Sequence, residues 1–203
     1  EHSLGANNID TAKSYWNIAH VYLDLNQADK ALFFFSRALP VFEKELGKEQ
    51  PYTASCYEKI ADLFLNKKDI QKALEHYSLT VKAYNTIGAK YQEQEDYDNA
   101  LCYFDLILSI CLRTIGPNHI NTASAYWNVA RVYYDMEEHD KAIENYKLAL
   151  EIQKTNEKLE DMAATYNAMG HAYYHKNDYE NTLECYEASL KTTRSEERFS
   201  RNA

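Results

Sequence analysis

Two histidines are the residues most suggestive of chemistry in this chain. His171 and His175 lie four residues apart, so both side chains would fall on one face of a helix and could bind one metal ion. A catalytic zinc site needs a third protein ligand, and a structural zinc site needs a fourth. No HExxH motif and no pair of cysteines completes such a set. We therefore expect no metal here and interpret the two histidines as residues of a binding surface.

The other candidates for catalysis are equally incomplete. Four carboxylates cluster at a polar break between two helical stretches, where solvated charge is ordinary: Glu93, Glu95, Asp96 and Asp98. The sequence has no glycine-rich phosphate loop, no GxSxG motif and no cysteine–histidine pair at a suitable spacing. We expect neither enzymatic activity nor a bound cofactor.

The four cysteines show no disulfide framework. They are Cys56, Cys102, Cys111 and Cys185, with no CxxC pair among them. Such isolated thiols are typical of intracellular proteins, where cysteines stay reduced and mostly pack into the interior. No stretch approaches the roughly 20 apolar residues of a membrane span, and no secretory signal opens the sequence. We therefore expect a cytoplasmic protein.

Charge and composition narrow the choice of partner. The 203 residues carry a formal net charge of −9, whereas a nucleic-acid surface needs clustered Lys and Arg. We expect neither nucleic acid nor a membrane as a partner. Five glycines and three prolines are few enough for long helices. The 18 tyrosines can fill the space between helices with their rings while their hydroxyls reach water.

The elements that must position any binding residues follow from a pattern that occurs five times along the chain. Its clearest copies are residues 11–19 and 122–130. In the second copy, one face of a helix is marked at the spacing i, i+3, i+4, i+7 by Tyr126, Val129, Ala130 and Tyr133. After a polar break, a second helical face follows with Ala142, Tyr146, Ala149 and Leu150. Small side chains at Ala130 and Ala142 let two helices cross closely, so the pattern predicts an antiparallel hairpin.

Five such hairpins in sequence predict an all-α solenoid. Each hairpin in a solenoid buries its apolar face against its neighbours. We expect a single array over residues 1–203, whose last residues, 196–203, form a polar tail. The expected repeats are approximately 4–45, 46–79, 80–114, 115–155 and 156–195.

The repeat resembles the tetratricopeptide repeat. An aromatic residue is followed by an aliphatic, a small and a second aromatic residue, and an alanine comes twelve residues after the small position. The period near 42 residues and the phrase Leu-Gly…Thr-Ala…Tyr-x-Asn-aliphatic-Ala are similar to the kinesin light chain subgroup. The resemblance implies a right-handed superhelix of about five hairpins that acts as a scaffold or adaptor. Its concave groove would hold a short linear peptide or a helix of another protein.

One step of the repeat is too short. The small residue that opens each second helix occurs at Ala31, Ala73, Ala100, Ala142 and Thr182. The second of these steps is 27 residues, whereas the first and third are 42. We expect that residues are missing between Leu79 and Thr80, which should then lie farther apart than one peptide bond allows. The alternative is an unbroken chain that forms one long fused helix.

The first helices of the hairpins should line the concave groove. The residues at groove positions are Lys13, Trp16, Asn17, His20, Lys59, Lys82, Asn85, Trp127, Asn128, Arg131, Asn167 and His171. The resemblance implies that Asn17 and Asn128 clamp the backbone of a ligand, although they could instead bridge adjacent helices. Trp16 and Trp127 either anchor a ligand or pack against the neighbouring helix.

The charges of the groove positions do not favour one kind of peptide. Lys13, Lys59, Lys82 and Arg131 could receive acidic groups, as the kinesin light chain groove does. Acidic residues interleave with these cations at Asp24, Glu58, Asp62, Glu93 and Asp135. A purely acidic peptide therefore fits less well here than in that subgroup.

A second class of function stays open. The array could be a structural spacer or a self-assembling repeat segment of a larger multidomain protein, in contact with others through its convex face or its ends. Phe33 and Phe34 would favour this interpretation if both were exposed as one patch.

Overall fold

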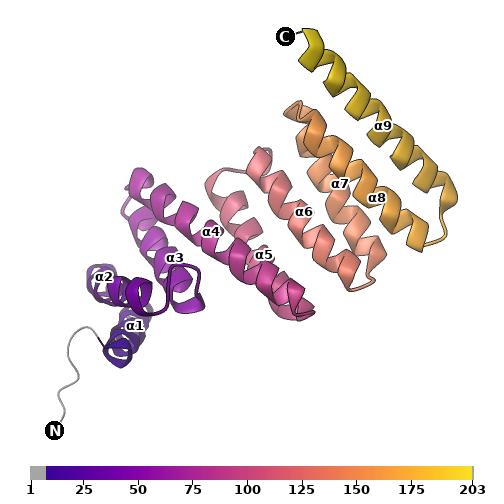
Figure 1. The fold of residues 1–203 in the computed structure, drawn as a ribbon. Coiled ribbons are helices and arrows are strands. Elements are labelled where there is room, and N and C mark those ends of the chain that lie inside the picture. Colours follow the sequence, from indigo (N-terminus) through magenta and orange to yellow (C-terminus); the bar gives the residue numbers. More distant parts are fainter. Residues whose placement is uncertain (1–7, 203) are drawn as a thin grey trace. The chain divides into compact units, whose positions relative to one another are not determined.

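The repeated pattern folds into helices throughout. The computed structural model describes residues 8–202, with side chains from 8 to 195, and this part of the chain has nine helices and no strand (Figure 1). The helices are α1 (Ile9–Asp24), α2 (Ala28–Glu45), α3 (Pro51–Asn66), α4 (Ile70–Glu93), α5 (Tyr97–Thr114), α6 (Ile120–Asp135), α7 (His139–Thr155), α8 (Leu159–His175) and α9 (Tyr179–Asn202). The predicted all-α class is therefore confirmed. None of these helices combines the length and the apolar character that a membrane span requires.

The helices form hairpins within two compact units. The first unit extends to Ile87 and the second begins at Gly88, so the boundary falls inside α4. In the first unit α1 packs against α2, and α2 against α3. In the second unit α6 packs against α7, α7 against α8 and α8 against α9.

The structure has no gap between Leu79 and Thr80. α4 runs without interruption from Ile70 to Glu93, and the Thr80 hydroxyl donates to the backbone oxygen of His76 at 2.9 Å. In this structure the short step of the repeat corresponds to one long helix. The first part of α4 takes the place of a second helix and its last part the place of a first helix, with no turn between them.

Small residues let the two helices of a hairpin approach each other. Ala19 and Ala31 are fully buried in one cluster with Phe35, and Ala130 and Ala142 hold the equivalent places in the second unit. In α8 the small position is Gly170. A Cβ atom there would lie 2.5 Å from the Tyr186 ring, so glycine is what lets this ring approach the backbone.

The tight turns share one backbone conformation. Each places a residue with a side chain in the left-handed region, at φ values of 54–62°. These residues are Asn26, Lys68, Glu95, Glu137, Glu157 and Asn177. In the turn between α6 and α7, the amide of Glu138 then donates to the backbone oxygen of Tyr133 at 2.9 Å, which closes the end of α6.

The Leu-Gly…Thr-Ala phrase connects one hairpin to the next. Gly47 and Gly116 end α2 and α5 with φ values of +99° and +87°, which favour glycine. The hydroxyls of Thr53 and Thr122, each fully buried at the start of the following helix, donate to the backbone oxygens of these glycines at 2.7 Å. The phrase therefore has a structural role in capping one helix and positioning the next.

Candidate peptide-binding face

The predicted groove residues all lie on first helices of hairpins, in two groups. In the first unit, α1 carries Lys13, Trp16, Asn17 and His20, α3 carries Lys59, and α4 carries Lys82 and Asn85. In the second unit, α6 carries Trp127, Asn128 and Arg131, and α8 carries Asn167 and His171. We call each group the first-helix face of its unit.

Trp16 and His20 form the centre of this face in the first unit. Their ring centroids lie 4.1 Å apart on successive turns of α1. Tyr52 meets the indole edge-on at 5.4 Å, and Phe35 meets the imidazole edge-on at 5.2 Å. The indole Nε1 and the imidazole Nε2 are both buried, and neither has a hydrogen-bond partner among the described residues. Burial of the ring, and next the nearby Lys59 ammonium, lower the pKa of His20, which favours the neutral imidazole.

The lysines of this face already have acidic neighbours within the chain. Lys59 Nζ lies 3.4 Å from Glu58 and 4.0 Å from Asp62. Tyr84 donates to Glu58 at 2.9 Å and Tyr77 to Asp62 at 2.5 Å, so both carboxylates are held in place.

The other two lysines show the same arrangement at the surface. Lys13 lies 3.9 Å from Asp10, and Lys82 lies 3.9 Å from Glu49. Exposed pairs of this kind contribute little to stability. Their local carboxylates nevertheless offset the positive charge that an acidic ligand would need.

Arg131 is the corresponding centre in the second unit. Its Nη2 donates to Gln92 Oε1 at 2.6 Å, and Gln92 in turn donates to Asp135. The guanidinium lies over the Trp127 ring at 5.5 Å, close enough for a cation–π interaction. Arg131 Nε is buried and has no hydrogen-bond partner among the described residues.

Both tryptophans also belong to the interior. Trp16 packs against the cluster around Phe35, and Trp127 lies 6.2 Å from the Tyr146 ring and packs against the cluster around it. Packing against neighbouring helices, one of the two roles that the sequence left open for them, is therefore observed.

The histidines of α8 face different helices. His171 is exposed, and its Nδ1 lies 3.1 Å from the Tyr186 hydroxyl of α9. His175 instead stacks on His139 of α7, with ring centroids 5.3 Å apart. Among the described residues there is no group of three or more His, Cys, Asp or Glu that could hold a metal ion.

The sequence did not predict a group of aromatic and histidine rings that meet at the turns of the second unit. Tyr134 lies 5.5 Å from His139 and 5.7 Å from His175, and Tyr174 lies 5.9 Å from Tyr179. These rings meet because the end of α6, the start of α7 and the end of α8 come together. The enrichment in Tyr and His near each turn is a signal, but it does not say which turns are neighbours.

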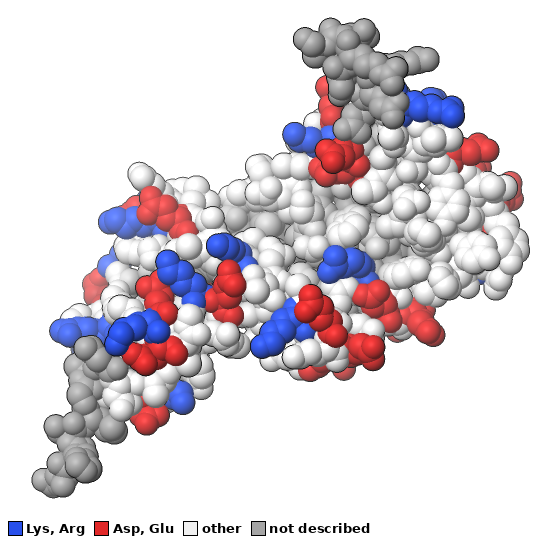
Figure 2. Space-filling model, viewed as in Figure 1, with Lys and Arg blue, Asp and Glu red and all other residues white. Residues whose placement is uncertain are grey.

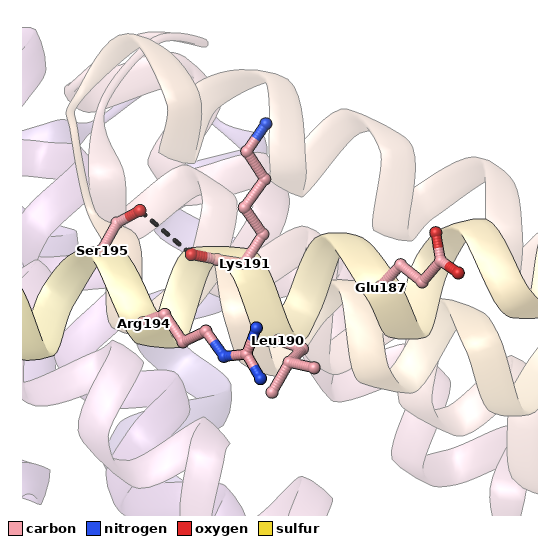
Figure 3. Close-up of a pocket in the computed structure, with 5 residues that line it drawn as sticks. All are labelled: Glu187, Leu190, Lys191, Arg194 and Ser195. Atoms are coloured by element: carbon pink, nitrogen blue, oxygen red, sulfur yellow. Dashed lines mark hydrogen bonds between the residues drawn. The ribbon is translucent and has the colours of Figure 1, made fainter.

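The surface of the second unit is sparsely charged over α6 and α8. Figure 2 shows few Lys, Arg, Asp or Glu side chains over α6 and α8, whereas charges gather toward the ends of the helices. Two shallow hollows in the described part of the chain lie away from the predicted residues. One runs along α9 (Figure 3), and the other lies at the starts of α6 and α8.

The sequence of this chain matches known family models over most of its length. Two models described as tetratricopeptide repeat match residues 10–84 and 79–155, and residues 163–195. The chain belongs to the tetratricopeptide repeat family. Repeats of this family generally mediate protein–protein interaction, and families of this type are typically non-enzymatic scaffolds.

Individual relatives of this tetratricopeptide repeat chain are much longer proteins. It is 26% identical over 144 residues to the Arabidopsis thaliana protein kinesin light chain-related 2. The aligned region covers 70% of this chain and 18% of the relative. It is 27% identical over 93 residues to a clustered mitochondria protein homolog of Lodderomyces elongisporus. The aligned region covers 46% of this chain and 7% of the relative.

A solved structure shows the same fold. The kinesin light chain of Podosopora anserina with nearly identical TPR-like repeats has a TM-score of 0.52 at 15% identity, covering 94% of this chain and 99% of that chain. The predicted resemblance to kinesin light chain-like tetratricopeptide repeats is thus confirmed.

Proposed function

We propose that this protein binds a segment of another protein on its first-helix faces, by hydrogen bonds to the segment's backbone and neutral polar groups. Three buried nitrogen atoms at predicted binding positions carry the proposal: Trp16 Nε1, His20 Nε2 and Arg131 Nε. Leaving a buried polar group unpaired costs about 1–3 kcal/mol, so a ligand whose binding turns these side chains outward would gain by pairing each of these atoms.

The chemistry of the three atoms suits a peptide backbone. The indole N–H of Trp16 and the Nε–H of Arg131 can only donate, and a peptide carbonyl accepts from both. Burial lowers the pKa of His20 and so favours the neutral imidazole, whose Nε2 can accept from a peptide N–H when the proton is on Nδ1. Trp16 and His20 together therefore match the donor–acceptor pair of an extended segment.

The charges favour a neutral segment over an acidic one. Lys13, Lys59 and Lys82 each have a carboxylate of this chain within 4.0 Å, and Arg131 is bound by Gln92. A row of acidic side chains on the ligand would have to compete with these neighbours. We therefore propose a ligand that is polar or aromatic and has few charges. We propose the cytoplasm as its compartment, because all four cysteines are free thiols.

The test is a selection of peptides from a proteome-derived library against the whole chain. Trp16→Phe removes the indole N–H while keeping an aromatic ring, and Arg131→Leu removes the guanidinium. Arg37→Leu is the matched control, because Arg37 is exposed on the second helix α2. We expect Trp16→Phe or Arg131→Leu to weaken the affinity for the selected peptides about tenfold or more, because each variant loses one buried hydrogen bond from a charged or aromatic donor. Arg37→Leu should leave affinity unchanged.

Two results would contradict the proposal. Peptides that keep their affinity in both first-helix variants bind elsewhere on the protein. A selection that yields no peptide above background would leave the three nitrogen atoms to water and favour a structural role for the array.

A further inference from the structure

The outward face of α2 carries two exposed apolar residues. Phe33 is 53% exposed, and Pro40, two turns further along the helix, is exposed as well. Phe34 is half-buried, packs against the cluster around Phe35, and meets the Phe33 ring edge-on at 5.3 Å. The two adjacent phenylalanines therefore do not form one exposed patch, and only Phe33 is open to a partner.

The direction of this face explains its exposure. α7 is packed between α6 and α8, yet its residues at the two equivalent positions, Glu144 and Glu151, are exposed. On α5 the same two positions are Cys102 and Ser109, which are exposed as well. A second helix thus turns these positions outward even where helices pack on both of its sides. α2 differs in carrying apolar side chains where α7 carries two glutamates.

Charged residues continue the same face to both ends of α2. Asp29 lies in the first turn and Lys44 in the last, with side chains that are 88% and 73% exposed. Intervals of three or four residues keep the whole series on one side of a helix. We call this series the outward line of α2, and its members are Asp29, Phe33, Ser36, Pro40 and Lys44, all exposed. The line is spaced symmetrically about its middle, and its two ends have opposite charges.

We propose that two copies of this chain associate through the outward line of α2, with the two helices antiparallel about a two-fold axis. In such a pair Asp29 of each copy faces Lys44 of the other, and Phe33 of each copy faces Pro40 of the other. A two-fold interface uses the same surface on both copies, so each of these contacts occurs twice. The symmetric spacing and opposite end charges make the line complementary to itself.

The middle of the line adds a polar contact. Pro40 has no amide hydrogen, so the backbone oxygen of Ser36 lacks the donor that a helix normally supplies. In the antiparallel pair Arg37 of the second copy lies opposite Ser36, and its guanidinium has several N–H donors. It can donate to this oxygen while it stays over its own Phe33 ring, which it contacts at 5.3 Å.

The charged ends of the line can accept a second partner. Lys67 donates to Asp29, and Lys44 Nζ lies 3.0 Å from Glu45. A carboxylate accepts more than one hydrogen bond, and an ammonium group donates more than one. Asp29 and Lys44 can therefore meet across the two copies without giving up their neighbours in the chain.

The geometry sets the size and the strength of the assembly. Each copy uses its one outward line of α2, so association should stop at a dimer. A contact of one helix pair is much smaller than the ~1,600 Å² of a standard interface, and the formal net charge of −9 on each copy opposes association. We therefore expect a dissociation constant weaker than roughly micromolar.

The experiment is sedimentation equilibrium of the 203-residue chain over a concentration series that extends to roughly millimolar. Asp29→Lys and Lys44→Asp each place two pairs of like charges across the dimer, and Phe33→Ser removes the aromatic contact. Asp140→Lys is the matched control, because Asp140 is the equivalent of Asp29 on α7, is 84% exposed and accepts from Lys176 in the same way.

The unsubstituted chain and Asp140→Lys should approach twice the monomer mass as concentration rises. Each of the three α2 variants should dimerise about tenfold or more weakly, because it loses its contact twice or gains two like-charge pairs. All the substituted side chains are exposed, so circular dichroism and melting temperature should stay close to those of the unsubstituted chain.

A mixture of two variants tests the antiparallel arrangement itself. In a mixed dimer of Asp29→Lys with Lys44→Asp, both end contacts again join opposite charges. An equal mixture should therefore dimerise about as well as the unsubstituted chain, although neither variant does so alone. Loss of folding in either variant cannot produce this rescue.

Several results would overturn the proposal. These are an unsubstituted chain that stays monomeric throughout, association that continues beyond a dimer, association that the three α2 variants leave unchanged, a mixture that stays monomeric, and association that Asp140→Lys abolishes as well. Failure of the peptide selection has no bearing on this outcome, because the outward line of α2 and the first-helix faces share no residue.

Discussion

Glu137 turns the chain between α6 and α7 in the left-handed conformation, with a φ of 62°. A residue with a Cβ atom is strained there, whereas glycine is not. The substitution Glu137→Gly should therefore stabilise the protein, although replacing a residue by glycine usually destabilises. Glu137 is exposed and lies between helices, so the change removes no packing.

The magnitude follows from two opposing effects. The left-handed conformation costs a residue with a side chain about 1–2 kcal/mol, which glycine avoids. Glycine loses more backbone entropy on folding, at a cost of about 0.5–1 kcal/mol. The difference predicts that the free energy of unfolding rises by about 0.5–1 kcal/mol, or by a few degrees in melting temperature for a chain of this length.

The matched control is Glu144→Gly in α7. Glu144 is also exposed, and its replacement changes the net charge by the same amount. Its backbone is helical, so glycine should lower the free energy of unfolding by about 1 kcal/mol. Glu137→Asn should give an intermediate effect, because asparagine tolerates the left-handed region better than glutamate.

Urea unfolding followed by circular dichroism measures all three variants against the unsubstituted chain. The decisive comparison is the sign of the two glycine substitutions. If Glu137→Gly destabilised the protein as much as Glu144→Gly does, Glu137 would not have a positive φ in solution, and the explanation of the tight turns would fail.

Three further predictions concern single side chains. Thr122→Val should lower the free energy of unfolding by about 1–2 kcal/mol, because the Gly116 carbonyl loses its hydroxyl donor; an unchanged urea midpoint would contradict this. The lowered pKa of His20 means that its stabilising contribution is present above the unfolded-state pKa of about 6.5 and is lost as the pH falls below it. A His20→Phe variant should therefore show a shallower loss of unfolding free energy toward acid pH than the unsubstituted chain. Finally, one thiol should react rapidly with a thiol reagent in the native state, because Cys102 is exposed whereas burial raises the pKa of Cys56 to about 12; rapid reaction of all four before denaturation would refute the packing.

The hairpins could be predicted because their signals are local. The small side chains of Ala130 and Ala142 predict a close crossing of two helices, and the aromatic residues around them recur at helical spacing. The short step near Leu79 is ambiguous in the sequence for the opposite reason. A missing connection and two helices fused into one leave the same short step in the sequence, and only the path of the backbone tells them apart.

The positions of the residues on the first-helix faces could be predicted from the sequence, but the pairing of their charges could not. Their first-helix location follows from the repeat, and the structure places each residue there. The pairing of Lys82 with Glu49 joins residues 33 positions apart, one in α4 and the other in the connection between α2 and α3, and no spacing rule connects them. The unpaired nitrogens of Trp16 and His20 depend on the depth of packing around two rings, which composition does not report.

The single helix α4 also affects where a protease can cut the chain. Elsewhere in the chain one hairpin passes to the next through a connection such as the one at Gly47 or Gly116, where a protease can cut between intact hairpins. Between the second and third hairpins no such site exists, because both use α4. The backbone within α4 should therefore resist limited proteolysis longer than the connections at Gly47 and Gly116 do.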